Sequence, residues 1–238
     1  MPRRFFRSVL RWSLASVSAI TLGGIIVFMG GESPHSPMGE SLPQLHGTQP
    51  LVMEGGDPYI RALMRTITAS EANVPQPYRI LYGGQRFSDF SRHPEQCIPI
   101  VTGPNVGNCT TAAGRYQFIN VTWYEKAKAY HPNPDGVFWW RRYSFAPQYQ
   151  DAVVYGWLSD PDAWGVDLRK LLRQGKIEQV LRRLSGTWTS LGYGIEDNVM
   201  SDQLPQIYEK ILQEELRSDI HYPLSTPPSP NDPHLIPT

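Results

Sequence analysis

Residues 57–71 read DPYIRALMRTITASE, and this stretch decides the fold class. Apolar side chains recur in it at the spacing of one helix face, and the same face ends in an acidic residue. The face consists of Ile60, Leu63, Met64, Ile67 and Glu71. Asp57 suits an N-cap and Pro58 suits the first helical position. We therefore predict an amphipathic helix that begins at Pro58 and ends just after Glu71.

Downstream of this helix the pattern changes twice. Between residues 80 and 107, short runs are broken by glycines and prolines, which predicts a small hairpin-like lobe or loops. Helical patterns resume over 113–130, 147–158, 177–184 and 202–216. A helix, a small β lobe and then a helical lobe make an α+β plan that is mostly helical. A cleft is expected where the lobes meet.

Composition divides the 238 residues into four segments. Residues 1–31 form a targeting segment, and residues 32–56, rich in Ser, Pro, Gly and Gln, are predicted to be a flexible linker. The folded domain is expected over 57–217, which is a normal single-domain size. Residues 218–238 form a Pro-rich tail with little to bury and are predicted to be disordered.

The targeting segment combines arginines with an apolar run. Arg3, Arg4, Arg7 and Arg11 precede residues 13–31, which carry no charge. As a helix this run would rise ~28 Å, close to the ~30 Å hydrocarbon core of a bilayer. Arginines on one side place the N-terminus in the cytoplasm and the body outside. The segment is either an uncleaved inner-membrane anchor, with the domain in the periplasm or cell exterior, or a cleaved signal peptide of a secreted protein. The missing small-x-small cleavage site favours the anchor.

Charge and cysteine content narrow the class of protein. Lys plus Arg and Asp plus Glu are both 22, and the chain after Arg11 carries 18 basic and 22 acidic residues, which argues against a nucleic-acid binder. Cys97 and Cys109 either form a disulfide, worth ~3 kcal/mol in an exported protein, or remain free thiols. No ligand cluster or phosphate-binding loop is present in the sequence, so we expect neither a metal nor a cofactor.

Glu71 is the candidate catalytic residue. It lies on the apolar face of its helix, where burial is expected to raise the pKa of a carboxyl and keep it protonated near neutral pH. Cleavage of a glycosidic bond requires such a proton donor, because the leaving oxygen must receive a proton as the bond breaks.

Five blocks of sequence place Glu71 in a wider pattern. They are SE at 70–71, GGQRFSDFSRHP at 83–94, TTAAGRYQ at 110–117, SFAPQYQDA at 144–152 and SGTWTSLGYG at 185–194. In this order they closely resemble the lambda-phage endolysin family, glycoside hydrolase family 104, over about residues 59–208. The resemblance implies a lysozyme-like fold and a muramidase that acts as a lytic transglycosylase on peptidoglycan.

The resemblance also implies roles for individual residues. Glu71 takes the place of the family's catalytic glutamate in a Ser-Glu-Gly block, although Ala72 replaces the glycine and leaves the backbone geometry there in question. The implied substrate contacts are Ser70, Tyr116, Gln117 and Tyr193. The region before Tyr193 is shorter than in the family.

Other residues in the blocks admit two interpretations. Trp123 and Trp188 are either sugar-stacking platforms or core residues, and core is favoured for both. Asp89 is expected to cap a turn rather than act as a second carboxylate. His93 is expected to be structural, and Arg115 to position a loop or pair with an acid.

The number of carboxylates indicates the mechanism. Hydrolysis of a glycoside normally uses two, whereas the resemblance supplies only Glu71. One acid suffices if the muramic C6 hydroxyl is the nucleophile, which yields 1,6-anhydromuramic ends. The alternatives are a hydrolytic lysozyme, a non-catalytic peptidoglycan-binding module, and a structural anchor whose tail recruits a partner. The expected partners are glycan strands and, through the N-terminal segment, the membrane; nucleic acid is not expected, and we expect a monomer.

Overall fold

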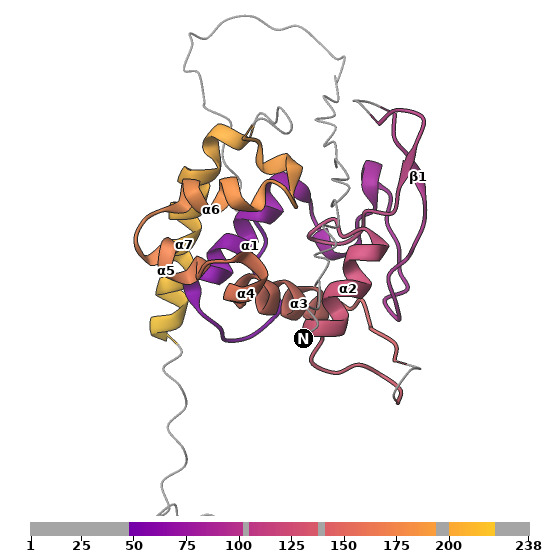
Figure 1. Cartoon of the computed structure of the whole chain (residues 1–238), viewed down its shortest axis with the longest axis horizontal. Coiled ribbons are helices and arrows are strands. Elements are labelled where there is room, and N and C mark those ends of the chain that lie inside the picture. The colour runs from indigo at the N-terminus through magenta and orange to yellow at the C-terminus, as the bar shows by residue number, and fades with distance from the viewer. Residues whose placement is uncertain (1–47, 102–104, 138–140, 194–199, 222–238) are drawn as a thin grey trace, which may run out of the picture.

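The computed structural model describes residues 48–101, 105–137, 141–193 and 200–221 (Figure 1). The predicted anchor or signal segment, residues 1–31, lies outside the described residues. So do linker residues 32–47 and tail residues 222–238. Within the described part of the chain, no helix has the length and apolar character needed to cross a membrane.

The described chain is mostly helical, with one small sheet. The helices are α1 (Pro58–Glu71), α2 (Asn120–Tyr130), α3 (Pro147–Ser159), α4 (Pro161–Trp164), α5 (Leu168–Arg173), α6 (Ile177–Leu184) and α7 (Leu204–His221). The strands are β1 (Ile98–Pro99) and β2 (Cys109–Thr110), and short 3₁₀ turns cover Pro77–Arg79, Tyr82–Gly84, Thr189–Leu191 and Ser201–Gln203. This architecture confirms the predicted α+β class with a small β lobe. Helices α4 and α5 were not predicted.

Helix α1 is central to the helical lobe, where α7 packs along it and α3 and α5 also contact it (Figure 1). Its predicted start and end are confirmed. Asp57 Oδ1 accepts hydrogen bonds from Tyr59 N (3.0 Å) and Ile60 N (3.3 Å), and Pro58 occupies the first turn. The side chains of α1 are buried from Ala62 to Glu71. A helix enclosed on nearly every side fixes the position of whatever stands at its last residue.

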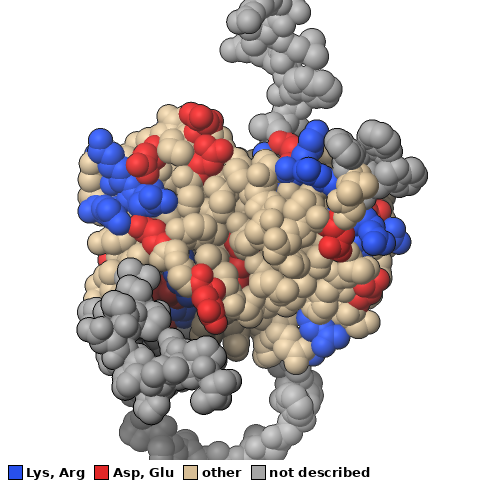
Figure 2. Space-filling model, turned by 90° about the horizontal axis from the view of Figure 1, so that it is seen from below, with Lys and Arg blue, Asp and Glu red and all other residues tan. Residues whose placement is uncertain are grey.

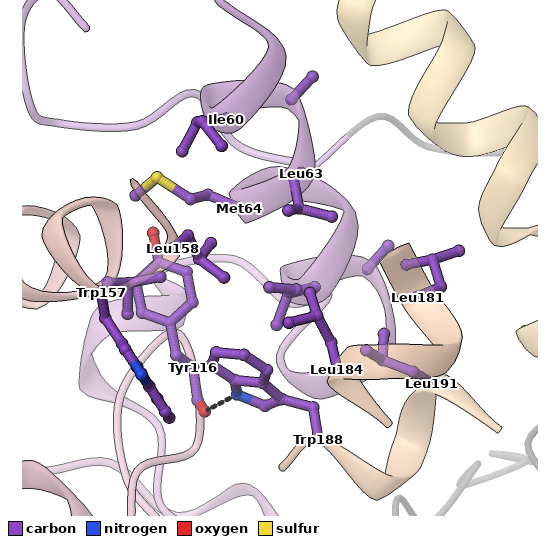
Figure 3. Close-up of a cluster of buried hydrophobic side chains, with 14 of the residues drawn as sticks. Ile60, Leu63, Met64, Tyr116, Trp157, Leu158, Leu181, Leu184, Trp188 and Leu191 are labelled. Carbon is purple, nitrogen blue, oxygen red and sulfur yellow. Dashed lines mark hydrogen bonds between the residues drawn. The ribbon is translucent and has the colours of Figure 1, made fainter. Parts of the chain in front are cut away.

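Apolar side chains from several elements surround α1. Leu63 and Met64 of α1 lie near Leu158 of α3, and Leu181 and Leu184 of α6 complete the cluster (Figure 3). Trp188 closes it on the side of the β lobe, where its Nε1 donates a 3.1 Å hydrogen bond to Tyr116 O. Complete burial of a leucine or methionine side chain in such a cluster stabilises the fold by about 1.5–3 kcal/mol.

Ion pairs connect α1 to α7 beside this core. Arg61 Nε lies 2.6 Å from Glu215 Oε2, and Arg65 Nη1 lies 2.8 Å from Glu215 Oε1. Glu215 and Arg65 are buried, so each charge depends on the other. Loss of one partner would leave an uncompensated buried charge, which is strongly destabilising.

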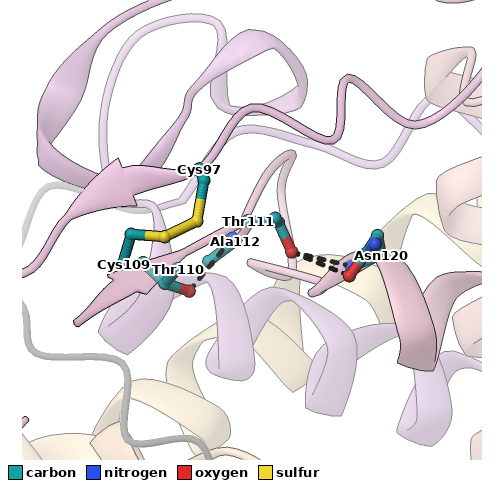
Figure 4. The surroundings of a disulfide bond; sticks show 6 residues. All are labelled: Cys97, Cys109, Thr110, Thr111, Ala112 and Asn120. Carbon is teal, nitrogen blue, oxygen red and sulfur yellow. Dashed lines mark hydrogen bonds between the residues drawn. A yellow bond between two sulfur atoms is a disulfide. The ribbon is translucent and has the colours of Figure 1, made fainter.

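The β lobe is held by a disulfide between Cys97 and Cys109, which confirms the predicted pairing (Figure 4). Strands β1 and β2 pair antiparallel, with Ile98 opposite Thr110. Beyond β2, Thr111 Oγ1 donates to Asn120 Oδ1 at 3.0 Å and accepts from Asn120 N at 3.0 Å. This exchange connects the lobe directly to the start of α2.

The prediction of a helix over 113–130 was wrong in its first third. Helix α2 begins at Asn120, and residues 114–117 form a turn closed by the pair Ala113 and Phe118, each of which donates its N–H to the other's carbonyl at 3.0 Å. Gly114 has φ +74° and Gln117 has φ +46°, and an α-helix admits neither value. The turn buries Tyr116 and Phe118, so apolar residues recur here at a spacing that resembles that of a helix.

The prediction of a flexible linker was wrong for residues 48–56. Residues 48–53, here called the strap, lie along the folded body. Leu51 is buried, Arg65 Nη2 donates to Thr48 O at 2.8 Å, and Arg115 Nη1 donates to Pro50 O at 2.8 Å. These bonds use backbone carbonyls, so the polar composition of the strap gave no indication of them. At the other end, α7 continues past residue 217, the predicted end of the domain.

The strap covers a buried carboxylate, Asp151 of α3. Its Oδ2 accepts from Val52 N (2.9 Å), Met53 N (3.1 Å) and Tyr78 OH (2.7 Å), and its Oδ1 accepts from Tyr116 OH (2.6 Å). Four donors therefore satisfy a charge that is 0% exposed.

The surface seen in Figure 2 carries small groups of basic and acidic side chains around a broad area without charge. The described residues form no continuous basic stripe on this face.

Candidate active site

Glu71, the last residue of α1, is 7% exposed and lines a cleft of about 250 Å³. The other lining residues come from β2, the 113–118 turn, α2, α3, α4 and the 186–189 segment: Thr110, Ala112, Tyr116, Gln117, Phe118, Ile119, Thr122, Glu125, Lys126, Trp157, Ala163, Trp164, Gly186, Thr187, Trp188 and Thr189. The cleft therefore lies between the β lobe and the helical lobe, as the sequence predicted.

The backbone after Glu71 needs no glycine. Ala72 ends the helix with φ −151°, an extended value that any residue adopts, and its N–H bonds to Thr68 O at 2.9 Å. The replacement of the family's glycine by Ala72 therefore requires no positive φ after Glu71.

A chain of hydroxyls supports the Glu71 carboxyl from behind. Ser190, fully buried in the Thr189–Leu191 turn, donates to Glu71 Oε1. Ser190 Oγ also lies 3.1 Å from Ser70 Oγ, and Ser70 donates to Ile67 O at 3.0 Å. A hydroxyl donates and accepts by rotating its hydrogen. The Ser190 hydroxyl can therefore accept a hydrogen bond from neutral Glu71 or donate one to ionised Glu71.

Three tryptophans form an aromatic wall in the cleft. Trp157 stacks on Trp164 with ring centroids 5.0 Å apart, and Trp188 lies 5.3 Å from Trp157. Trp157 and Trp188 are buried, Trp164 is half-buried, and all three line the cleft. Apolar ring faces beside hydrogen-bonding groups suit a saccharide, which has both apolar faces and polar edges.

Gln117 lies at the opposite side, in the turn that precedes α2. Its left-handed φ of +46° is rare for a residue other than glycine, and its Nε2 donates to Gly114 O at 2.9 Å. Gly114 must be glycine, because a Cβ there would lie 2.3 Å from Gln150 Oε1. Gln150 and Phe145 therefore pack closely against the turn at Gly114, and Gln117 lines the cleft.

Three of the predicted substrate contacts, Ser70, Tyr116 and Tyr193, are not placed for direct side-chain contact in the cleft. Ser70 is buried behind Glu71 and has no open path to a ligand. Tyr116 borders the cleft, but its ring is fully buried and its hydroxyl is bound to Asp151. Tyr193 is absent from the cleft lining; the guanidinium of Arg182 lies 4.8 Å from its ring centroid. Ser70 and Tyr116 therefore support the site, and direct contact through their side chains is not expected.

The structure assigns Trp123, Trp188 and Asp89, each of which had two possible roles. Trp123 is entirely buried against Phe145, so it is a core residue as favoured, and Trp188 is both a core residue and part of the cleft wall. Asp89 caps a turn, because Ser91 N donates to its Oδ1 at 2.8 Å, and this bond lowers the pKa of Asp89. Asp89 does not line the cleft.

His93 and Arg115 hold loops together. His93 is buried between Phe118 O, 2.8 Å from its Nε2, and Glu95 N, which donates to its Nδ1 at 3.1 Å. Arg115 donates to Thr68 Oγ1, Tyr78 OH and two strap carbonyls. In the described part of the chain, no group of three His, Cys, Asp or Glu side chains is arranged to hold a metal ion.

Sequence reasoning missed Trp157, Trp164, Glu125, Lys126 and Ser190. Trp157 is one of several apolar residues on α3, and the pattern alone marks it as core. Glu125 and Lys126 resemble an ordinary solvated helix face. Ser190 lies inside the 185–194 block, and its proximity to Glu71 depends on contact between segments far apart in the chain.

Comparisons with known proteins agree on one family. A family model described as Endolysin matches residues 61–213. The endolysin of Escherichia phage lambda is 30% identical over 122 residues, which cover 49% of this chain and 64% of that endolysin, so the match spans less than two thirds of the relative's length.

Two solved structures are similar. The bacteriophage lambda lysozyme complexed with a chitohexasaccharide is 25% identical, with a TM-score of 0.49, and the match covers 67% of this chain and 97% of that one. A second structure of lysozyme from bacteriophage lambda is 22% identical, with a TM-score of 0.45, and the match covers 70% of this chain and 97% of that one.

Proposed function

The chain belongs to the endolysin family, and from this premise we propose that it is a lysozyme-type enzyme that cleaves the glycan strands of peptidoglycan. The bond in question joins N-acetylmuramic acid to N-acetylglucosamine. The observation that carries the proposal is the position of Glu71, a nearly buried carboxyl at the end of an enclosed helix and at the wall of an aromatic cleft.

The geometry suits a proton donor. A carboxyl with 7% exposure is largely removed from bulk water, and burial of this kind favours the neutral form that can donate a proton. Helix α1 is packed on nearly all sides, so the carboxyl needs little reorganisation to meet a bound glycosidic oxygen.

The finer proposal is a lytic transglycosylase. Glu71 donates its proton to the glycosidic oxygen, and the bond between that oxygen and muramic C1 breaks. The resulting carboxylate then takes the proton of the muramic C6 hydroxyl, whose oxygen bonds to C1 and closes the 1,6-anhydro ring. The same residue is an acid in the first step and a base in the second. The Ser190 and Ser70 hydroxyls support this exchange, because they can serve both states of the carboxyl.

Hydrolysis is the second candidate, and one observation favours it. Glu125 also lines the cleft, and it is the only carboxylate besides Glu71 among the described lining residues. A second carboxylate could activate water. Against this role, Glu125 is 64% exposed and its Oε1 lies 2.7 Å from Lys126 Nζ, so it is engaged as an ion pair.

Mass spectrometry of digested sacculi separates the two reactions. Transglycosylation leaves 1,6-anhydromuramic ends, and hydrolysis leaves reducing ends heavier by one water. We expect anhydro ends from the wild type and from Glu125→Gln, and no release from Glu71→Gln. Reducing ends alone, abolished by Glu125→Gln, would establish hydrolysis instead.

A non-catalytic binding module is tested by the same variant. Glu71→Gln keeps the size and the hydrogen-bonding capacity of the side chain, so it should retain binding to sacculi while it loses cleavage. Wild-type protein that binds sacculi but releases no soluble fragment under any condition would indicate a binding module.

We further propose that residues 1–31 tether the enzyme to the inner membrane, with the domain outside the cytoplasm. The arginine cluster and the uncharged run support this proposal. Fractionation of cells that produce the full chain, followed by N-terminal sequencing of the mature protein, tests it. Intact protein in the membrane fraction is expected, and a processed protein in the soluble envelope fraction would indicate a cleaved signal peptide.

A further inference from the structure

Lys126 is the only Lys or Arg side chain among the described residues that line the cleft. It stands in α2, and its side chain is 20% exposed, much less than a lysine on an open helix face. Its neighbour Lys128 on the same helix is exposed and does not line the cleft. One lysine of α2 is therefore directed into the site and the other into solvent.

The aromatic wall holds the Lys126 ammonium in place. Lys126 Nζ lies 4.5 Å from the centroid of the Trp157 ring, within the range of a cation–π interaction. The ammonium thus lies over the Trp157 ring, in the cleft that both residues line. Trp157 is stacked on Trp164. A saccharide ring on this wall would bring its substituents next to the ammonium.

The ion pair between Lys126 and Glu125 is weak, so a substrate group can displace Glu125. Lys126 Nζ donates a hydrogen bond to Glu125 Oε1 at 2.7 Å, but the Glu125 side chain is 64% exposed. An ion pair with so exposed a partner contributes little to stability. A substrate carboxylate inside the cleft would be better shielded from water, so it can replace Glu125.

Peptidoglycan supplies such a group, whereas a neutral glycan does not. Muramic acid carries a lactyl carboxyl, which is free in bare strands and otherwise continues into a peptide that ends in carboxylates. We propose that Lys126 is a substrate-recognition residue that binds a carboxylate of the muramyl unit or its peptide and directs the enzyme to charged strands. This inference rests on the proposed function, because it assigns the substrate preference of the same cleft.

Binding to sacculi tests the inference. The full chain carries Glu71→Gln throughout, so that strands are bound but not cut, and sedimentation measures binding to native sacculi and to sacculi whose carboxylates have been amidated. We expect the Glu71→Gln protein to bind native sacculi about three- to tenfold more tightly, as for a partly shielded ion pair. Added Lys126→Met should remove this preference and keep the apolar cover of Trp157.

Three further variants make the comparison specific. Lys126→Arg keeps the charge and should restore the preference, and Lys128→Met, the matched change on the same helix, should leave it intact. Glu125→Gln removes the competing carboxylate and should increase the preference. A preference that persists in Lys126→Met would overturn the inference, as would equal loss of binding to both preparations, which indicates a packing role only.

Two additional results complete the test. Strands stripped of peptide carry only the lactyl carboxyl, so retained preference with them assigns this group, and its loss assigns the peptide carboxylates. If the Glu71→Gln protein binds neither native nor amidated sacculi, the proposed function fails. If it binds both equally, only the inference about Lys126 fails.

Discussion

Asp151 and Glu71 are both buried carboxyls, but their surroundings differ. Asp151 is 0% exposed and accepts from four donors: two strap amides and the hydroxyls of Tyr78 and Tyr116. Glu71 borders a cleft, and a serine hydroxyl that can reverse its role stands behind it. Asp151 accepts all four of these hydrogen bonds, which hold its carboxyl in one position. Glu71 is adjacent to a group that accepts either protonation state, which suits proton transfer.

The tyrosines around Asp151 make the contrast sharper. Burial raises the pKa of Tyr78 and of Tyr116, and the nearby charge of Asp151 raises it further. Both hydroxyls therefore hold their protons more strongly than a free tyrosine, and both donate to Asp151. The Asp151 network therefore has a structural role, whereas the Glu71 carboxyl borders the cleft beside a hydroxyl that can donate or accept.

The largest expected effect is on catalysis. Glu71→Gln removes the transferable proton and keeps the shape of the side chain, so we expect glycan release to fall by about 1000-fold. The free energy of unfolding should change little, because the amide still bonds to Ser190. Zymograms and chemical denaturation of the full chain measure the two quantities.

Glu209→Gln is the matched control on the exposed face of α7, and it should leave both quantities unchanged. Full activity of the Glu71→Gln protein would contradict the role of Glu71.

The second largest effect is expected on stability, from substitution of Asp151. Asp151→Asn replaces an acceptor by an amide NH₂ that faces N–H and O–H donors, so we expect a loss of about 3 kcal/mol in the free energy of unfolding. Activity per folded molecule should persist. Asp162→Asn in α4, an exposed acid, should change stability by less than about 0.5 kcal/mol. Equal stability of the Asp151→Asn and Asp162→Asn proteins would show that the strap is not held by this charge.

The same two regions show what the sequence could and could not predict. The start of helix α1 was predicted correctly, because a capping Asp, a Pro and a clear apolar period all agree, and Glu71 was placed just before its end. The strap was missed. Its contacts to Arg65 and Arg115 run through backbone carbonyls, which every residue has, so composition gave a linker.

Trp157 and Trp164 of the aromatic wall were missed for a different reason, whereas Trp188 had been named as a possible sugar-stacking residue. Trp157, Trp164 and Trp188 belong to α3, α4 and the segment before the Thr189–Leu191 turn, and only the tertiary fold brings them together. Each has the pattern of an ordinary core residue. The turn at Gly114–Gln117 was mistaken for a helix, because positive φ at Gln117 has no marker in the sequence.

A smaller effect is expected behind Glu71. Ser190→Ala removes the donor to Glu71 Oε1, so the carboxyl loses its fixed orientation and its support as a base. We expect about a tenfold fall in kcat, equivalent to ~1.4 kcal/mol, with little change in KM. Ser185→Ala is the matched control, because Ser185 is also buried but donates to Arg182 O at 2.8 Å and does not line the cleft. Equal kcat in both variants would mean that Ser190 only packs.

The smallest expected effect concerns pH and two histidines with the same bonding pattern. His93 and His131 each accept a backbone N–H at Nδ1 and face a carbonyl at Nε2. Burial lowers the pKa of both, and His93 is the more deeply buried. Protonation at Nδ1 would remove the acceptor for Glu95 N, so the folded state resists it. Stability from His93 is thus complete above the unfolded pKa of ~6.5 and is lost as pH falls below that value towards the folded pKa. Unfolding measured from pH 7 down to pH 5 should show a steeper loss for the wild type than for His93→Gln, with a smaller difference for His131→Gln. Parallel curves for wild type and His93→Gln would show that this histidine does not contribute to the acid sensitivity of the fold.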